Sequence, residues 1–195
     1  MKKYNMNEIE VKAKLRNKEK VLEYIKNSGA EFLGKKHQKV IVFWPNEIRK
    51  IEDGTNLLGI NYLRIRNQTS EKGKKVIFTL KQPQTNQSDC KEHEIEIKED
   101  DIKNLESIIL TLGFYEFCIT EKDRETYKMG NIEICVDDVV GLGSYIELEK
   151  FGEYNETEKI QTELQNILES WKISKEDCIY DGYDILAYKQ NQKSA

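Results

Sequence analysis

The chain has few of the residues that form disulfides, interrupt secondary structure or bind transition metals. Its 195 residues include four cysteines, two prolines and two histidines. The cysteines, at positions 90, 118, 135 and 178, form no Cys-x-x-Cys pair, which favours free thiols in a reduced cytosol over a zinc site. His37 and His93 are too few for a histidine-rich metal centre, and we interpret both as surface or rim residues. Two prolines and no Ser/Gly-rich linker argue against an internal boundary, so we expect one domain over residues 1–195.

Long apolar runs and a strong net charge are also missing. No run approaches the ~20 apolar residues that a membrane span requires, and Met1 leads into Lys2 and Lys3 rather than into a signal sequence. The formal net charge of −4 gives no general attraction for nucleic acid or for an anionic membrane. We therefore expect a cytoplasmic protein that has neither nucleic acid nor membrane as a partner.

Apolar residues recur at helical spacing in three places, and a shorter fourth segment follows them. The expected helices cover residues 17–28, 101–112, 157–171 and about 181–189. Asn17 is placed to cap the first helix, and Gly29 follows its end. The polar stretches 45–60, 82–91 and the tail 190–195 are expected to be the least ordered parts of the chain.

Segments with a period of two lie between these helices. They are residues 7–15, 38–44, 61–67, 74–81, 91–98, 119–127, 131–139 and 144–151. Because several of them follow one another directly, we expect an α+β chain with a mostly antiparallel sheet. Eight is also the number of strands that closes a barrel just wide enough to hold side chains or one small ligand.

Several of these strands alternate an apolar face with a face that carries charges of one sign. Carboxylates concentrate on the first, fifth and last strands, whereas basic residues concentrate on 61–66, 81 and 122–124. A sheet with one face in water would explain the alternation by itself. Like charges on neighbouring strands repel, however, so the clusters are easier to explain if divalent cations neutralise the acids and a polyanion neutralises the bases. Both interpretations remain open at this point.

The segment Glu8-Ile9-Glu10-Val11-Lys12 is an ExExK sequence, which alone is weak because it occurs by chance in many charged strands. The order of the later motifs is more specific: LRIR at 63–66, TLK at 79–81, EHEIEI at 92–97, the KxR of Lys122 and Arg124, and DDVVGLGSYIELE at 137–149. Together these motifs resemble the CYTH domain, the triphosphate tunnel metalloenzymes, over about residues 7–188. The EVKAKL opening and the GYDIL ending look most like the class IV adenylyl cyclase branch.

The resemblance implies an eight-stranded antiparallel closed β-barrel, a triphosphate tunnel, with helices packed on its outside. It assigns six basic residues to the triphosphate: Lys12, Arg64, Arg66, Lys81, Lys122 and Arg124. It assigns five acidic residues to Mg²⁺ or Mn²⁺, namely Glu8, Glu10, Asp137, Glu147 and Glu149, with Glu94 and Glu96 as further candidates. Oxygen-only ligands suit both of these ions. The residues expected to be catalytic are Glu10, Lys12, Asp137 and Glu147.

The leading functional hypothesis is the conversion of ATP to cyclic AMP and pyrophosphate. The alternative is a triphosphatase that hydrolyses thiamine triphosphate, inorganic tripolyphosphate or a nucleoside triphosphate. A third hypothesis, a non-catalytic module that binds a phosphorylated ligand, is disfavoured because such a module could manage with basic residues alone. The resemblance is also compatible with a homodimer, although no sequence feature demands one.

Two positions depart from the family's pattern or leave a choice open. His93 stands where relatives often have an arginine before the acidic strand, so one phosphate contact is expected to be missing. The acid at the start of the last motif is doubled as Asp137 and Asp138. We favour Asp137 as the ligand because it shares strand parity with Glu133 and Cys135.

Overall fold

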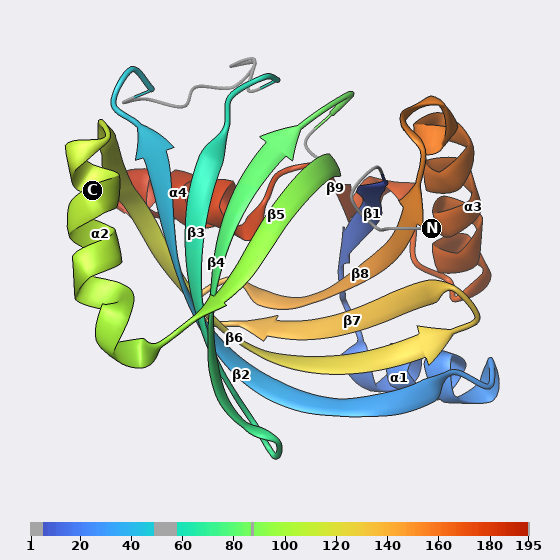
Figure 1. Cartoon of the computed structure of the whole chain (residues 1–195). Coiled ribbons are helices and arrows are strands. Elements are labelled where there is room, and N and C mark those ends of the chain that lie inside the picture. The colour runs from blue at the N-terminus through green and yellow to red at the C-terminus, as the bar shows by residue number, and fades with distance from the viewer. Residues whose placement is uncertain (1–5, 49–57, 87, 195) are drawn as a thin grey trace.

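The computed structural model describes residues 6–48, 58–86 and 88–194, in which strands wrap into a barrel with helices around it (Figure 1). The strands are β1 (Asn7–Lys14), β2 (Glu31–Pro45), β3 (Tyr62–Ser70), β4 (Gly73–Pro83), β5 (Asp89–Ile97), β6 (Phe114–Met129), β7 (Ile132–Val139), β8 (Gly143–Gly152) and β9 (Cys178–Ile179). The α-helices are α1 (Lys18–Asn27), α2 (Ile102–Thr111), α3 (Thr157–Ser170) and α4 (Tyr183–Ser194). Short 3₁₀ turns cover Glu99–Asp101, Tyr154–Glu156 and Lys175–Asp177.

Eight of the strands form one antiparallel sheet that closes on itself. Their order is β5-β4-β3-β2-β6-β7-β8-β1, and β1 then returns to β5. β1 pairs with β8 along its whole length, Asn7–Lys14, but meets β5 in only two pairs, Glu8 with Cys90 and Ile9 with Asp89. The short β9 pairs with β1 near its other end. The structure confirms the predicted closed antiparallel barrel.

Period-two alternation sends most apolar side chains of the strands to the outer face, where the helices cover them. Ile9 and Val11 of β1 belong to one buried cluster with Ile25 of α1 and with Leu164 and Leu168 of α3. Fully burying an aliphatic side chain of this size contributes roughly 1.5–3 kcal/mol. The pairing of these helices with the outer face therefore leaves the inner face to the charged residues.

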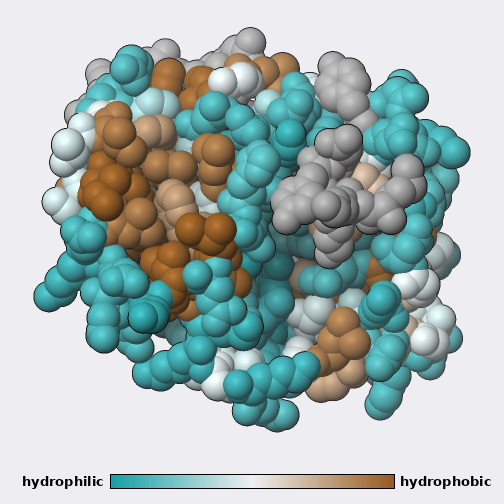
Figure 2. All heavy atoms as spheres, in the orientation of Figure 1, coloured by the Kyte–Doolittle hydropathy of each residue, from teal (hydrophilic) through white to brown (hydrophobic). Residues whose placement is uncertain are grey.

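The helix α2 covers a second part of the outer face but not all of it. Ile109 of α2 is buried against Leu63 and Ile65 of β3. Figure 2 shows apolar side chains gathered on this side of the molecule, over α2 and the neighbouring strands. Ile95 of β5 is 59% exposed and Leu112, just after α2, is 68% exposed, so an apolar surface remains beside the helix. None of the described helices combines the length and apolar character needed to cross a membrane.

The helix α4 starts at one end of the barrel rather than along its side. Its Ile185 is buried in one cluster with Val40, Val42 and Trp44 of β2 and with Tyr62 of β3. These strand residues share the inward parity of Gln38, which lines the interior. The first turn of α4 therefore closes that end of the interior with apolar side chains.

Several element boundaries differ from those expected. β2 and β6 are longer than the predicted 38–44 and 119–127, and β9 was not predicted. Within the stretch 82–91, β4 continues to Pro83 and β5 begins at Asp89. The polar tail 190–195 was expected to be poorly ordered, but α4 continues through it to Ser194. Residues 49–57 of the stretch 45–60, also expected to be poorly ordered, lie outside the described residues.

Candidate functional site

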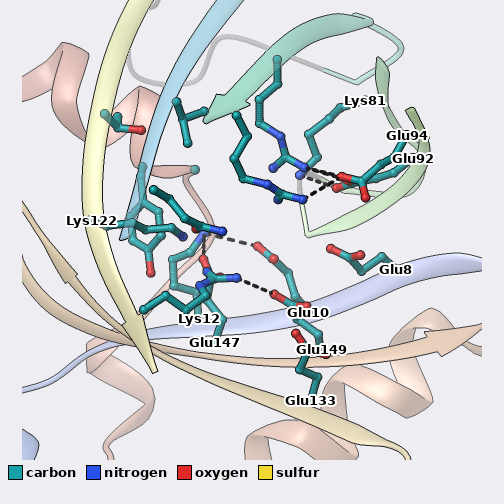
Figure 3. Close-up of a pocket in the computed structure, with 18 of the residues that line it drawn as sticks. Glu8, Glu10, Lys12, Lys81, Glu92, Glu94, Lys122, Glu133, Glu147 and Glu149 are labelled. Carbon is teal, nitrogen blue, oxygen red and sulfur yellow. Dashed lines mark hydrogen bonds and ion pairs between the residues drawn. The ribbon is translucent and has the colours of Figure 1, made fainter. Parts of the chain in front are cut away.

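The inward-facing side chains line a cavity of about 650 Å³ (Figure 3). Eight lysine or arginine side chains line it: Lys12, Lys36, Arg64, Arg66, Lys81, Lys122, Arg124 and Lys128. Seven glutamates line it with them: Glu8, Glu10, Glu92, Glu94, Glu133, Glu147 and Glu149. The charged face of the strands is thus the wall of an interior space, not a face turned to bulk water.

β3, β4 and β5 supply the first charged wall of the cavity. Arg64 Nη2 lies 3.0 Å from Glu92 Oε2 and 3.1 Å from Glu94 Oε1, and Arg66 Nη2 lies 3.1 Å from the same Glu94 oxygen. Lys81 Nζ lies 2.6 Å from Glu92 Oε1. The buried Nε atoms of Arg64 and Arg66 have no hydrogen-bond partner in the described part of the chain. This wall therefore keeps unused donors that an anion could accept.

β1, β6, β7 and β8 supply the second wall. Asp137 is fully buried and accepts hydrogen bonds from Lys122 Nζ at 2.8 Å and from Arg124 Nε and Nη2 at 2.6 Å each. Arg124 also pairs with Glu147, whose other carboxylate oxygen lies 3.2 Å from Lys12 Nζ. A bidentate arginine–carboxylate pair fixes the orientation of the guanidinium. Asp137 thus holds two cations of this wall in place.

Three carboxylates form a row across the same wall. Glu149 of β8 lies directly opposite Glu133 of β7 on one side and Glu10 of β1 on the other. Carboxylate oxygens of Glu8, Glu10 and Glu149 all lie within 4.8 Å of one another. Like charges directly opposite on a sheet are destabilising, so the row is a site of electrostatic repulsion unless a cation is present.

Burial and neighbouring negative charge both shift the pKa values of this acidic group. Burial and the neighbouring Glu92 raise the pKa of Glu8 to about 8, and burial together with Glu8 raises the pKa of Glu149 well above its ordinary value. An all-oxygen set of converging carboxylates matches the ligands that Mg²⁺ and Mn²⁺ prefer. Glu8, Glu10 and Glu149 therefore fit a divalent cation of this class.

Two cations of the cavity show the opposite imbalance. Burial and the nearby Arg64 lower the pKa of Arg66, and burial with the nearby Arg124 lowers the pKa of Lys122. By contrast, the pKa of Lys12 is raised, because Glu10 and Glu147 outweigh the effect of its burial. Arg66 and Lys122, on facing walls, thus lack full neutralisation by the protein and can gain from a bound anion.

One end of the cavity is apolar and aromatic. Its lining there includes Val40 and Val42 of β2, Tyr62 of β3, and Tyr183 and Ile185 at the start of α4, with the carboxylate of Asp184 between the last two accepting a hydrogen bond from Trp44 Nε1. The ring of Tyr183 lies under Lys12 Nζ and Lys122 Nζ, which are 4.6 and 4.5 Å from its centroid. The apolar end therefore adjoins the cationic wall directly, and a ligand could contact both at once.

All but two of the residues predicted for the site line the cavity, although their individual roles remain predictions. Glu96 does not: its side chain is 59% exposed and pairs with Lys75. Asp137 lies behind the lining and binds Lys122 and Arg124 instead. Asp138 points to the outside, where it pairs with Lys18 and accepts a hydrogen bond from Ser144, and the choice of Asp137 over Asp138 as a metal ligand stays a prediction.

Five charged residues of the cavity were not predicted as site residues: Lys36, Glu92, Lys128, Glu133 and Asp184. Strand parity places Glu92 with Glu94, and Glu133 with Asp137, so this signal was present for both. Lys36 and Lys128 lie in parts of β2 and β6 that extend beyond the strands predicted there, so no parity could be assigned to them. His37 and His93 are exposed and do not line the cavity.

Comparison with known proteins gives a match to one family over most of the chain. The family model of the CYTH domain matches residues 6–183. A protein of Methanocaldococcus jannaschii, named "Putative adenylate cyclase", is 35% identical over 181 residues, which cover 91% of this chain and 97% of that protein.

Solved structures share the fold. A protein of Pyrococcus horikoshii OT3 superposes with a TM-score of 0.77 at 26% identity, covering 93% of this chain and 99% of its own. A protein of Hippeastrum, described as "Putative adenylyl cyclase HpAC1 from Hippeastrum reveals a dominant triphophatase activity", has a TM-score of 0.60 at 14% identity. That match covers 95% of this chain and 96% of the other. At this sequence identity it shows a shared fold and nothing further.

Proposed function

The chain belongs to the CYTH domain family, and from that premise we propose that it is a divalent-metal-dependent enzyme acting on an organic triphosphate. One observation carries the proposal: the cavity holds under-neutralised acids and under-neutralised cations at separate places. The pKa values of Glu8 and Glu149 are raised, which disfavours their negatively charged form. The pKa values of Arg66 and Lys122 are lowered, which disfavours their positively charged form. A cation at the first pair and a polyanion at the second would relieve both imbalances.

The two basic walls would bind the phosphate chain between them. Arg64, Arg66 and Lys81 face it from β3 and β4, and Lys12, Lys122 and Arg124 face it from β1 and β6. The guanidinium groups supply several fixed donors, and the ammonium groups act as point charges. A bound triphosphate would compete with Glu92, Glu94 and Glu147 for these cations, which frees the carboxylates to turn toward the metal.

Glu8, Glu10 and Glu149 would hold Mg²⁺ or Mn²⁺, with Glu147 next to them on β8. The metal supplies charge neutralisation on phosphate oxygens and a lowered pKa for an attacking hydroxyl or water. Lys12 lies between two carboxylates of the site, because its Nζ is 3.3 Å from Glu10 and 3.2 Å from Glu147. It would orient both carboxylates and stabilise negative charge that develops on the phosphate.

The apolar end of the cavity favours a triphosphate that carries an organic group. Inorganic tripolyphosphate has no part that would bury apolar surface against Val40, Val42 and Ile185. A base or a thiazole ring would do so while its phosphates reach Lys12 and Lys122. We therefore infer that ATP is the preferred substrate and cyclic AMP with pyrophosphate the products, in agreement with the name of the 35% identical relative.

In that reaction the ribose 3′-oxygen bonds to the α-phosphorus, and the bond from this phosphorus to the bridging oxygen breaks. Pyrophosphate leaves into the basic wall, and the proton of the hydroxyl passes to solvent. Hydrolysis at the γ-phosphorus uses the same residues with water as the nucleophile, and it is the competing outcome.

Incubation with ATP and Mn²⁺, followed by ion-exchange chromatography and phosphate analysis, separates the two reactions. Cyclic AMP with an equal amount of pyrophosphate supports the cyclase. ADP with orthophosphate overturns the cyclase and retains the triphosphatase. A variant at a residue outside the cavity, Lys14→Met, should give the same products as the parent protein, because Lys14 is exposed and does not line the cavity. No turnover of ATP, thiamine triphosphate or tripolyphosphate by a protein that binds them would overturn the proposal of an enzyme.

A further inference from the structure

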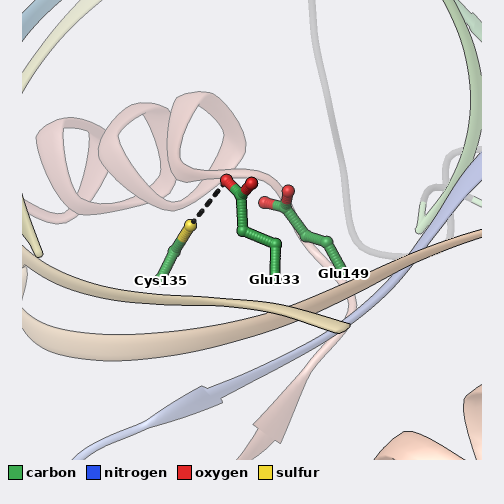
Figure 4. Close-up of side chains that lie close together, drawn as sticks. All are labelled: Glu133, Cys135 and Glu149. Atoms are coloured by element: carbon green, nitrogen blue, oxygen red, sulfur yellow. Dashed lines mark hydrogen bonds between the residues drawn. The ribbon is translucent and has the colours of Figure 1, made fainter. Parts of the chain in front are cut away.

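A second group of metal-binding side chains lies beside the acidic group already described. Glu133 and Cys135 of β7 and Glu149 of β8 turn toward one another (Figure 4), and their ligand atoms all lie within 4.8 Å. Cys135 Sγ lies 3.6 Å from Glu133 Oε1. Glu133 and Glu149 are directly opposite in the strand register. Cys135 is fully buried, but Glu133 and Glu149 line the cavity, which gives a cation a path to the thiol.

A buried hydroxyl supplies an independent indication of a ligand here. Thr126 of β6 lies directly opposite Cys135 of β7, so both side chains project from the same face of the sheet. Thr126 is 6% exposed, and its Oγ1 has no hydrogen-bond partner among the residues that the structure describes. An unpaired buried hydroxyl costs roughly 1–3 kcal/mol. Because Thr126 pairs with Cys135 on the inner face, a cation bound at Cys135 would offer this unpaired oxygen a partner.

The chemistry of this donor set differs from that of Glu8 and Glu10. A thiolate is a soft ligand that selects zinc-class cations over Mg²⁺ and Mn²⁺, whereas an all-oxygen set does not. One sulfur, two carboxylates and one hydroxyl also match the four ligands of a tetrahedral site. We propose that Glu133, Cys135, Glu149 and Thr126 form a binding site for a thiophilic divalent cation such as Zn²⁺ or Co²⁺.

The site has a consequence for catalysis that rests on the proposed function. Glu149 belongs to both donor groups, because it also lies with Glu8 and Glu10. As the bond between the metal and Sγ forms, the Cys135 thiol loses its proton to solvent, and Glu149 turns to the new ion. The carboxylate is then withdrawn from the Mg²⁺ or Mn²⁺ ligands. Zinc-class cations therefore inhibit the enzyme from inside the cavity, in competition with the activating metal.

Titration of the metal-free protein with Co²⁺ tests the site without any measurement of turnover. A thiolate-to-cobalt charge-transfer band in the near ultraviolet is expected, with an end point near one equivalent. Cys135→Ser should abolish the band, and Glu133→Gln should weaken Co²⁺ binding by about tenfold or more. Cys178→Ser is the matched control, since Cys178 lies on β9 and does not line the cavity, and it should keep the band. Circular dichroism verifies that each variant is folded.

Three results would overturn the site: no band in the parent protein, a band that survives Cys135→Ser, or equal Co²⁺ affinity in the parent and Glu133→Gln. The last comparison decides the matter even if Cys135→Ser does not fold. In a second arm, Zn²⁺ is added to turnover driven by Mn²⁺, and Cys135→Ser should raise the half-inhibitory concentration at least about tenfold. A cobalt band without triphosphate turnover would overturn the proposed function and support the site. Triphosphate turnover without a cobalt band would support the proposed function and overturn the site.

Discussion

Glu147 and Glu149 lie two residues apart on β8 with both side chains on the inner face, yet their pKa values move in opposite directions. Although burial alone would raise it, Arg124, Lys122 and Lys12 hold the pKa of Glu147 well below its ordinary value. Burial and Glu8 hold the pKa of Glu149 well above it. The strand thus carries one carboxylate that three cations neutralise and one whose single ion pair, with Arg124 at 3.6 Å, does not offset burial and its acidic neighbours. We expect the first to stabilise the fold and the second to serve a bound cation.

Substitution of these two glutamates should separate their roles. Glu149→Gln removes a buried like charge, so the metal-free protein should gain about 1 kcal/mol, which raises Tm by roughly 2–4 °C. Glu147→Gln breaks buried ion pairs and should cost about 3–5 kcal/mol. Thermal unfolding with a chelator present, followed by circular dichroism, measures both. Equal shifts of the same sign in the two variants would contradict the assignment.

Lys12 should be required for turnover. Its ammonium group lies between Glu10 and Glu147 at 3.3 and 3.2 Å and faces the proposed phosphate site. Lys12→Met should lower kcat by about 10²–10³-fold, as expected when one preorganised charge at the reacting phosphate is lost. Steady-state kinetics with ATP and Mn²⁺ measure the effect, and Lys14→Met should leave kcat near the parent value. A Lys12→Met enzyme with kcat within a factor of two of the parent would refute the role.

The apolar end of the cavity should decide which triphosphate is used. Val42→Trp fills the space beside Tyr62 and Ile185, so KM for ATP should rise at least about tenfold, while any activity on tripolyphosphate should be unchanged. Ile119→Trp is the matched control, because Ile119 is 46% exposed and does not line the cavity. If Val42→Trp changes KM for both substrates equally, the organic group does not bind at this end.

The lowered pKa of Glu92 should make the free energy of unfolding depend on pH. Burial alone would raise its pKa, but Lys81 and Arg64 lower it to about 2 in the folded protein, from 4.5 as the ordinary value. A lowered pKa stabilises the folded state above pH 4.5, and this contribution is lost as the pH falls through 4.5 toward 2. The loss amounts to roughly 3 kcal/mol for one group. Urea unfolding of the parent and of Glu92→Gln should give a difference that shrinks over this window. A difference that stays constant would argue against the shifted pKa.

Asp89 should be important for closing the barrel. This fully buried carboxylate accepts hydrogen bonds from Asn7 Nδ2 at 2.7 Å, from Thr85 Oγ1 at 2.6 Å and from Thr157 Oγ1 at 2.9 Å. Asp89→Ala leaves these buried donors without the acceptor, so we expect a loss of at least about 3 kcal/mol. Chemical denaturation measures it, with the exposed Asp100→Ala as the control. A loss below about 1 kcal/mol would show that other contacts close the barrel.

The charged interior could be predicted because strand parity is a simple consequence of the pleat. Lys122 and Arg124 share parity on β6, and Asp137 shares it with Cys135 on β7, so a correct choice of strand places each residue on a face. The same parity failed for Glu96. It lies near the end of β5, where Lys75 and solvent surround its side chain, and the cavity does not reach so far. Parity gives the face of a residue but not the depth of the cavity.

The lengths of β2 and β6 could not be predicted from alternation, because both faces carry charge in their paired parts. Lys36 and Arg124 point inward, whereas Lys35 and Glu125 form an ion pair outside at 2.9 Å. A segment with charges on both faces has no hydrophobic period of two, although it is held in the sheet by its backbone hydrogen bonds. β9 is two residues long, which is too short for any period.

The closure of the barrel through two residue pairs between β1 and β5 gives the wall a built-in line of weakness. Every other junction of the barrel joins longer runs of residues, so expansion around a bulky substrate should open this line first. The parts on either side are the sheet of β3–β5, with Arg64 and Lys81, and the sheet of β6–β8 with β1, which carries Glu10 and Glu149. Entry and release would then change the spacing between the two basic walls and leave the acidic row of β1, β8 and β7 intact, and faster amide hydrogen exchange along β5 would report that movement.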